Sequence, residues 1–302
     1  MASPTLSRLA VVAAALLFST GGAAIKLVSL PALQIAGLRA GIAAVTLLVL
    51  LRLPLRSFGA GSLLTGAAQA ATMALFVIGN KLTTAAATIF LQSTAPLYVL
   101  ALSPALLGER IRRADVGFLA LFALGLALFF VDVGPAQATA PDPLLGNLAA
   151  CGSGLAWAGT VLGLRWLALR QGRTAQGVVA AHRALGGPRE ANPVAAATVL
   201  GNVLVFVGCL PWLLPLPALS AAELAVVLWL GVAQVGLAYF CLAYGIRHVR
   251  AFDVTMLLLL EPVLNPVWAW LLHGETPGAW ALAGGVVILA TSAARTWYNP
   301  PP

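Results

Sequence analysis

Charged residues are scarce in this sequence. Lys, Arg, Asp and Glu together make up 9% of its 302 residues, whereas 61% of the residues are hydrophobic. A soluble domain carries about a quarter charged residues, so this chain has too little charged surface to cover a soluble core. The mean hydropathy of +0.96 points the same way. The sequence therefore predicts an integral membrane protein.

Cysteine and histidine are also rare. Cys151, Cys209 and Cys241 lie inside apolar runs, and neither a CxxC motif nor a Cys/His spacing accompanies them. No disulfide framework and no metal site is predicted. HExxH motifs, paired aspartates and Gly-rich phosphate loops are lacking too, so no catalytic residue and no cofactor is predicted. An intramembrane enzyme is the remote alternative.

The apolar runs set the helix count. Spans of about 17–25 residues, ended by Pro and Gly, are typical of transmembrane helices. The sequence predicts ten of them, at 9–30, 34–51, 62–80, 84–107, 115–132, 144–168, 194–213, 222–245, 254–272 and 278–296.

Arginines between these spans set the orientation. The net charge of +8 comes from residues scattered between apolar runs, which indicates membrane topology rather than a nucleic-acid partner. Nearly all of them fall on one side, which the positive-inside rule assigns to the cytoplasm. Both termini are expected there, while Lys81, Asp142 and Glu275 are expected on the outer side. The longest cytoplasmic connector, 170–192, is expected to be irregular.

The chain repeats itself. One constant shift places Pro96 on Pro262 and Glu109 on Glu275 without a gap, which indicates an internal duplication. We expect a first five-helix repeat at 1–138 and a second at 139–302. Because five is odd, the second repeat enters the membrane inverted. Inverted repeats are typical of secondary transporters whose substrate site lies near the midplane. The predicted fold is therefore all-α, with ten transmembrane helices in two inverted repeats around a central cavity.

The segment 253–275 carries polar residues at membrane depth. Glu261-Pro262 and Asn265-Pro266 interrupt an otherwise apolar span. A carboxylate at this depth normally faces a bundle interior or a cavity, and each proline removes a backbone hydrogen bond. Pro96, Pro262 and Pro266 are predicted hinges; fixed kinks that shape packing are the alternative.

Two long signatures resemble a known family. The stretches STAPLYVLALSPALLGERI (93–111) and LEPVLNPVWAWLLHGETP (260–277) resemble the drug/metabolite transporter superfamily in its ten-helix EamA-type branch, and most of all the YddG group of exporters. The resemblance implies a basket-like bundle with a central cavity, a place in a bacterial-type inner membrane, and a facilitator or secondary carrier mechanism. It also implies export of amino acids, notably aromatic ones, and of some cationic drugs.

Recognition of an amino acid needs partners for a carboxylate and an ammonium group and a pocket for the side chain. Glu261 is the sharpest candidate, because it can bind an amine or accept a proton; a structural carboxylate, hydrogen-bonded or paired with Arg39 or Lys26, is the alternative. Arg39 can attract a carboxylate or serve structure alone. The predicted substrate-binding residues are Gln92, Tyr98, Trp157, Tyr239, Glu261, Asn265 and Trp268.

A different solute is the runner-up. Carriers of phosphorylated or nucleotide-linked sugars need clustered Lys and Arg facing the cavity. Here the charges at depth are Lys26, Arg39 and Glu261, which favours a zwitterion or a weakly charged substrate. The expected partners are a small-molecule substrate and the lipid bilayer, and one chain can form the pathway as a monomer.

Overall fold

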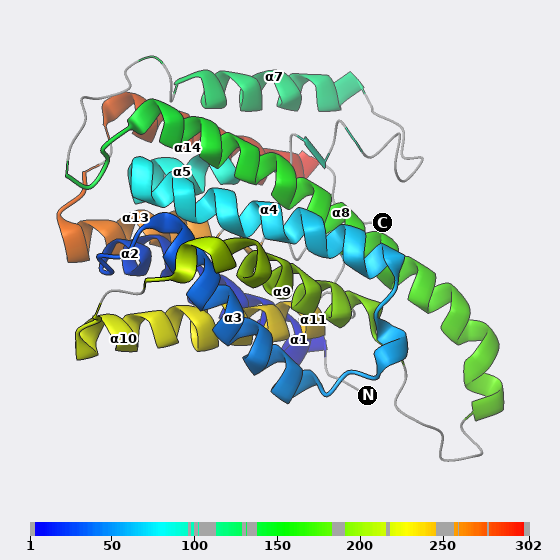
Figure 1. Cartoon of the computed structure of the whole chain (residues 1–302). Coiled ribbons are helices and arrows are strands. Elements are labelled where there is room, and N and C mark those ends of the chain that lie inside the picture. The colour runs from blue at the N-terminus through cyan, green and yellow to red at the C-terminus, as the bar shows by residue number, and fades with distance from the viewer. Residues whose placement is uncertain are drawn as a thin grey trace.

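A computed structural model describes residues 4–95, 98–99, 102, 113–128, 131, 138–182, 191–215, 218–245, 257–258, 260–276 and 278–298. Within these ranges the secondary-structure elements are helices, apart from a single bridge residue at Ala140, which confirms the all-α fold (Figure 1).

The helices before residue 138 are α1 (Pro4–Ser19), α2 (Gly21–Lys26), α3 (Ala32–Leu51), the 3-10 helix η1 (Leu55–Ser57), α4 (Ala60–Leu82), α5 (Ala85–Gln92) and α7 (Arg113–Leu128). The later helices are α8 (Pro143–His182), α9 (Pro193–Leu213), α10 (Ala221–Leu228), the π-helix η2 (Trp229–Leu237), α11 (Ala238–Gly245), α13 (Leu260–His273) and α14 (Ala279–Tyr298).

Several helices are long and apolar enough to cross a membrane, which agrees with a multi-pass membrane protein. Six stretches of the described residues meet this description: Leu6–Lys26, Ala32–Leu51, Ala60–Leu82, Pro143–Gln171, Pro193–Leu213 and Ala221–Gly245. The remaining predicted spans coincide in part with α5, α7, α13 and α14. The division of the chain at residue 138 stays a prediction.

The first predicted span is broken. Its helix ends at Ser19 and restarts at Gly21, leaving Thr20 in a turn. The hydroxyls of Ser19 and Thr20 donate to the carbonyls of Leu16 and Leu17, at 2.7 and 2.8 Å. Such back-bonding bends a helix because it competes with the backbone ladder.

The connector after the sixth span differs from the expectation. Instead of becoming irregular near residue 170, α8 continues as a helix to His182. The stretch 166–182 contains no proline and is rich in Ala, Leu, Arg and Gln, which favour helix. Residues 183–190 lie outside the described part of the chain.

Helices from the two ends of the chain pack against one another. The helix α4 packs against both α8 and α9, α3 packs against α9 and η2, and α1 packs against α11 and α13 (Figure 1). Small residues permit this closeness: a Cβ atom on Gly66 would lie 3.0 Å from the Ala197 carbonyl oxygen. Elements distant in sequence therefore meet in the middle of the bundle.

Candidate substrate pocket

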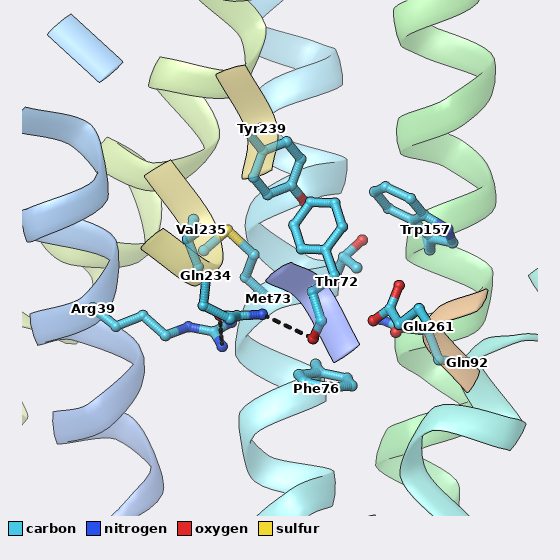
Figure 2. A pocket seen from close by; sticks show the side chains of 11 residues that line it. Arg39, Thr72, Met73, Phe76, Gln92, Trp157, Gln234, Val235, Tyr239 and Glu261 are labelled. Atoms are coloured by element: carbon cyan, nitrogen blue, oxygen red, sulfur yellow. Dashed lines mark hydrogen bonds between the residues drawn. The ribbon is translucent and has the colours of Figure 1, made fainter. Parts of the chain in front are cut away.

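A pocket opens where these helices meet (Figure 2). The space between its lining atoms is about 430 Å³, counting the open space at its mouth. The lining residues come from α1 (Phe18), α3 (Arg39), α4 (Thr72, Met73, Phe76), α5 (Gln92), α8 (Trp157), η2 (Gln234, Val235), α11 (Tyr239) and α13 (Glu261).

Aromatic rings form much of the wall. Phe18 and Tyr239 meet edge to face, with ring centroids 5.1 Å apart and planes at 75°. Phe76 and Trp157 face the same space (Figure 2). Rings in this arrangement offer faces and edges on which a flat apolar group or an organic cation can rest.

Arg39 lies on one side of the pocket and is only 2% exposed. Its Nη1 donates to Gln234 Oε1 at 3.3 Å, and Gln234 Nε2 donates to the Phe18 carbonyl oxygen at 3.4 Å (Figure 2). Among the described residues, no carboxylate lies within ion-pair distance of the guanidinium. The carboxamide of Gln234 therefore connects Arg39 to the point where the first helix breaks.

Glu261 lies on the opposite side of the pocket, near Gln92 and Trp157 (Figure 2). It is half-buried, and its carboxylate has no hydrogen-bond or ion-pair partner in the part of the chain that the structure describes. The alternative that pairs Glu261 with Arg39 or Lys26 is therefore wrong for this structure. Lys26 forms its ion pair with Glu275, at 2.7 Å.

The structure brings together part of the predicted set. Gln92, Trp157, Tyr239 and Glu261 line the pocket, whereas half-buried Tyr98 does not.

Two predicted residues of α13 lie beyond the pocket. Asn265 is fully buried, and a Cβ atom on Gly22 would lie 2.7 Å from its Oδ1. The Trp268 indole donates to Ser19 Oγ at 3.1 Å. Both side chains therefore meet the broken first helix rather than this pocket.

The predicted hinges remain untested. Pro262 and Pro266 both lie within α13, while Pro96 lies outside the described residues.

Sequence reasoning missed part of the lining. Arg39 and Gln234 are polar residues inside apolar runs, but the sequence carries no signal that they face each other. The remaining lining residues that were not predicted are Phe18, Thr72, Met73, Phe76 and Val235.

The chain is similar to known transporters. Residues 5–131 and 144–294 match the EamA-like transporter family. The uncharacterized transporter YdfC of Bacillus subtilis (strain 168) is 36% identical over 88 residues, which cover 26% of this chain and 28% of YdfC. A solved crystal structure has a TM-score of 0.62 and 20% identity, and the match covers 98% of each chain. At that identity the likeness shows the fold alone.

Proposed function

The chain belongs to the EamA-like transporter family, and from this premise we propose that it exports amino acids, aromatic or other neutral ones, together with some cationic drugs. It acts as a secondary transporter or facilitator of the YddG group in a bacterial inner membrane. The substrate moves by alternating access, through a pocket that opens to one side of the membrane at a time.

The observation that carries the proposal is that a carboxylate and several aromatic rings line the same pocket. Glu261 faces the pocket without a partner among the described residues, and the rings of Phe18, Trp157 and Tyr239 share the space. An aromatic amino acid supplies an ammonium group for the carboxylate and a flat side chain for the rings. A cationic drug supplies the same two features.

The pocket disfavours a sugar-phosphate substrate. Such a substrate needs several cations around its phosphates, and Arg39 is the one cation among the described lining residues. The charge balance of the pocket suits a zwitterion better, because one cation and one anion, Arg39 and Glu261, line it.

One chain holds a whole pocket, since helices from both ends of the sequence line it. We therefore propose that the monomer is the working unit. The distribution of arginines supports cytoplasmic N- and C-termini.

Counterflow in liposomes tests the proposal. The purified protein is reconstituted, and uptake of radiolabelled phenylalanine, leucine or a cationic dye is followed for the wild type and for Glu261→Gln. We expect the wild type to exchange the amino acids and Glu261→Gln to lose most of this exchange. A control, Glu223→Gln, removes a carboxylate that does not line the pocket and should retain it. If only sugar conjugates move, the substrate proposal is wrong while the family stands.

A further inference from the structure

We propose that Arg39, positioned by Gln234, is the subsite that binds the substrate's carboxylate. The proposal rests on the function proposed above and narrows it, because a substrate that uses this subsite must carry a carboxylate as well as an amine.

Arg39 is a buried cation with no ion-pair partner among the described residues. Arg39 is 2% exposed, its Nε has no hydrogen-bond partner among the described residues, and its hydrogen bond to Gln234 reaches a neutral oxygen at 3.3 Å. A buried charge is costly unless an opposite charge compensates it. In the described part of the chain no carboxylate is close enough to do so, while the pocket borders the side chain. An anion in the pocket supplies the missing compensation, and the planar guanidinium suits a carboxylate in particular.

The local backbone holds Arg39 and Gln234 in place. Gly21 lies against Gln234, since a Cβ atom there would approach Gln234 Nε2 to 2.5 Å. Gly231 lies against α3 in the same way, with a Cβ position 3.1 Å from the Arg39 carbonyl oxygen. Two glycines thus let η2 and the start of α2 close around Arg39, and the Gln234 carboxamide fixes the side chain at the pocket wall.

The opposite wall fits the rest of the substrate. Glu261 faces the pocket from the other side (Figure 2), and the rings of Phe18 and Tyr239 line the same pocket. A zwitterion with an aromatic side chain therefore has a complementary group for each of its parts.

Two ligands that differ by one group test the assignment. Binding of phenylalanine and of phenethylamine, which lacks the carboxylate, is measured by calorimetry on the purified protein. We expect the wild type to prefer phenylalanine by about tenfold or more, the size of a hydrogen bond to a charged group. In Arg39→Gln this preference should vanish while phenethylamine still binds.

A second variant covers the case in which Arg39→Gln does not fold. Gln234→Glu places a carboxylate beside Arg39, where it should compete with the carboxylate of the substrate. We expect this variant to bind phenylalanine about tenfold or more weakly than the wild type does, and its affinity for phenethylamine should not fall. The matched control Gln171→Glu, in α8 and away from the pocket, should keep the wild-type preference. An unchanged preference in Arg39→Gln or Gln234→Glu would overturn the subsite. Absence of any amino acid binding by the wild type would instead overturn the proposed function.

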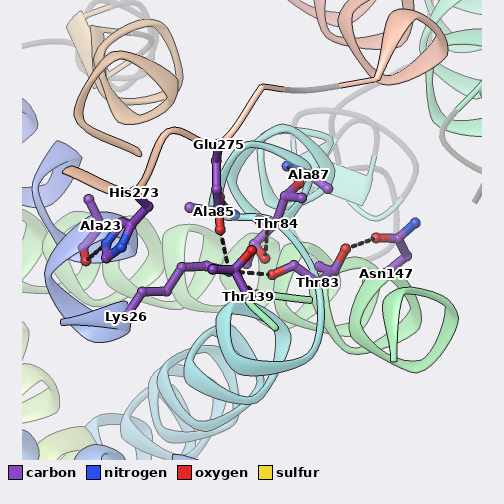
Figure 3. Close-up of polar contacts among 11 residues, drawn as sticks. Ala23, Lys26, Thr83, Thr84, Ala85, Ala87, Thr139, Asn147, His273 and Glu275 are labelled. Carbon is purple, nitrogen blue, oxygen red and sulfur yellow. Dashed lines mark hydrogen bonds and ion pairs between the residues drawn. The ribbon is translucent and has the colours of Figure 1, made fainter. Parts of the chain in front are cut away.

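At the other end of the pocket helices, a buried ion pair joins segments far apart in sequence (Figure 3). Lys26 and Glu275 lie 2.7 Å apart, with side chains 4% and 5% exposed. Lys26 also donates to the carbonyl oxygens of Thr83, at 2.9 Å, and Thr139. Glu275 Oε2 accepts the N–H of Ala85 at 3.1 Å. We infer that the Lys26–Glu275 pair is the latch that closes the outer end of the pathway.

The Lys26–Glu275 latch lies at one end of helices that also line the pocket. Phe18 precedes Lys26 along α1 and α2, and Phe76 precedes Thr83 at the end of α4. Both intervals are roughly 7–8 residues, or about 10–12 Å of helix. Glu275 follows α13, the helix of Glu261, so the ion pair and the hydrogen bond from Lys26 to Thr83 together join three pocket walls at the same end. Alternating access requires these walls to separate there, and the pair must break when they do.

Labelling of the pocket from outside tests the latch. The three natural cysteines are replaced by alanine, Phe76→Cys is introduced into the pocket wall, and its reaction with a membrane-impermeant maleimide is followed in outward-oriented proteoliposomes. We expect Lys26→Met or Glu275→Gln to raise the labelling rate about tenfold, corresponding to about 1.4 kcal/mol. The exchanged pair Lys26→Glu with Glu275→Lys should restore slow labelling.

Asp142→Asn is the matched control, because it removes an exposed carboxylate from the same end of the bundle and should leave the rate unchanged. If the single variants do not fold, Glu275→Asp keeps the charge, shortens the reach and should raise the rate by a smaller factor. Labelling as slow as in the parent protein, in any folded variant that breaks the pair, would overturn the latch.

Discussion

Replacing Gly146 with alanine tests how closely α8 packs against the turn between α4 and α5. A Cβ atom at this position would lie 2.6 Å from the Thr83 backbone nitrogen, 2.7 Å from Thr83 Cβ and 2.8 Å from the Leu82 carbonyl carbon. Two of these atoms belong to the backbone, so no side-chain rotation can relieve the clash. The α8 helix would have to move away from the turn.

That movement weakens other contacts. The Asp142 N–H donates to the Leu82 carbonyl oxygen at 3.0 Å, and Thr83 Oγ1 donates to Asn147 Oδ1 at 2.9 Å. Overpacking costs about 1–3 kcal/mol, while alanine gains about 0.5–1 kcal/mol over glycine in a helix. We expect a net loss of about 1–2 kcal/mol in the free energy of unfolding.

Gly208→Ala provides the control. Gly208 also lies within a helix, α9, and nothing stands within 4 Å of its Cβ position. Both variants gain the same helix propensity, so they should differ by the cost of overpacking alone, about 1–3 kcal/mol. In thermal unfolding of detergent-solubilised protein, this difference corresponds to a separation on the order of 5 °C. If Gly146→Ala unfolds at the same temperature as Gly208→Ala, the packing described here is wrong.

Three further substitutions have expected outcomes in the same unfolding assay. Ser220→Ala removes the hydroxyl that caps α10 by accepting the Glu223 N–H at 3.2 Å, and should cost about 1 kcal/mol; an unchanged midpoint would contradict the cap. Trp268→Phe removes the indole hydrogen bond to Ser19 and should cost about 1 kcal/mol. Trp270→Phe, at a side chain 57% exposed, should change the midpoint less than Trp268→Phe does; equal shifts would contradict the distinction.

The polar face of α13 shows how far the sequence can lead. Glu261, Asn265 and Trp268 recur at helical spacing, which predicts that they share one face and point into the bundle. The structure places all three against the first helix or the pocket. Only Glu261 reaches the pocket, because α2 packs against α13 one turn further on. Where a cavity ends along a helix depends on such packing, and periodicity carries no information about it.

Arg39 and Gln234 show a second limit. Each is a polar residue in an apolar run. Their contact nevertheless joins α3 to η2, between residues 195 positions apart in the sequence. Its geometry depends on a π-helix inside a run, 222–245, whose apolar pattern predicts an ordinary α-helix. A long-range contact that follows from a local departure in helix type lies outside what composition and spacing can predict.

The number of residues in the π-helix η2 determines how α11 after it is turned relative to α10 before it. Each hydrogen-bonded ring in it spans one residue more than in an α-helix. Deleting a single residue such as Val232 lets the segment close into an α-helix with its backbone bonds intact. The helix after the deletion, which carries both Gln234 and Tyr239, then turns by about 100° relative to α10 before it, so these two side chains cannot face the pocket while α10 keeps its contacts. A change that barely alters the hydropathy of the span would in this way remove Gln234 and Tyr239 from the pocket wall.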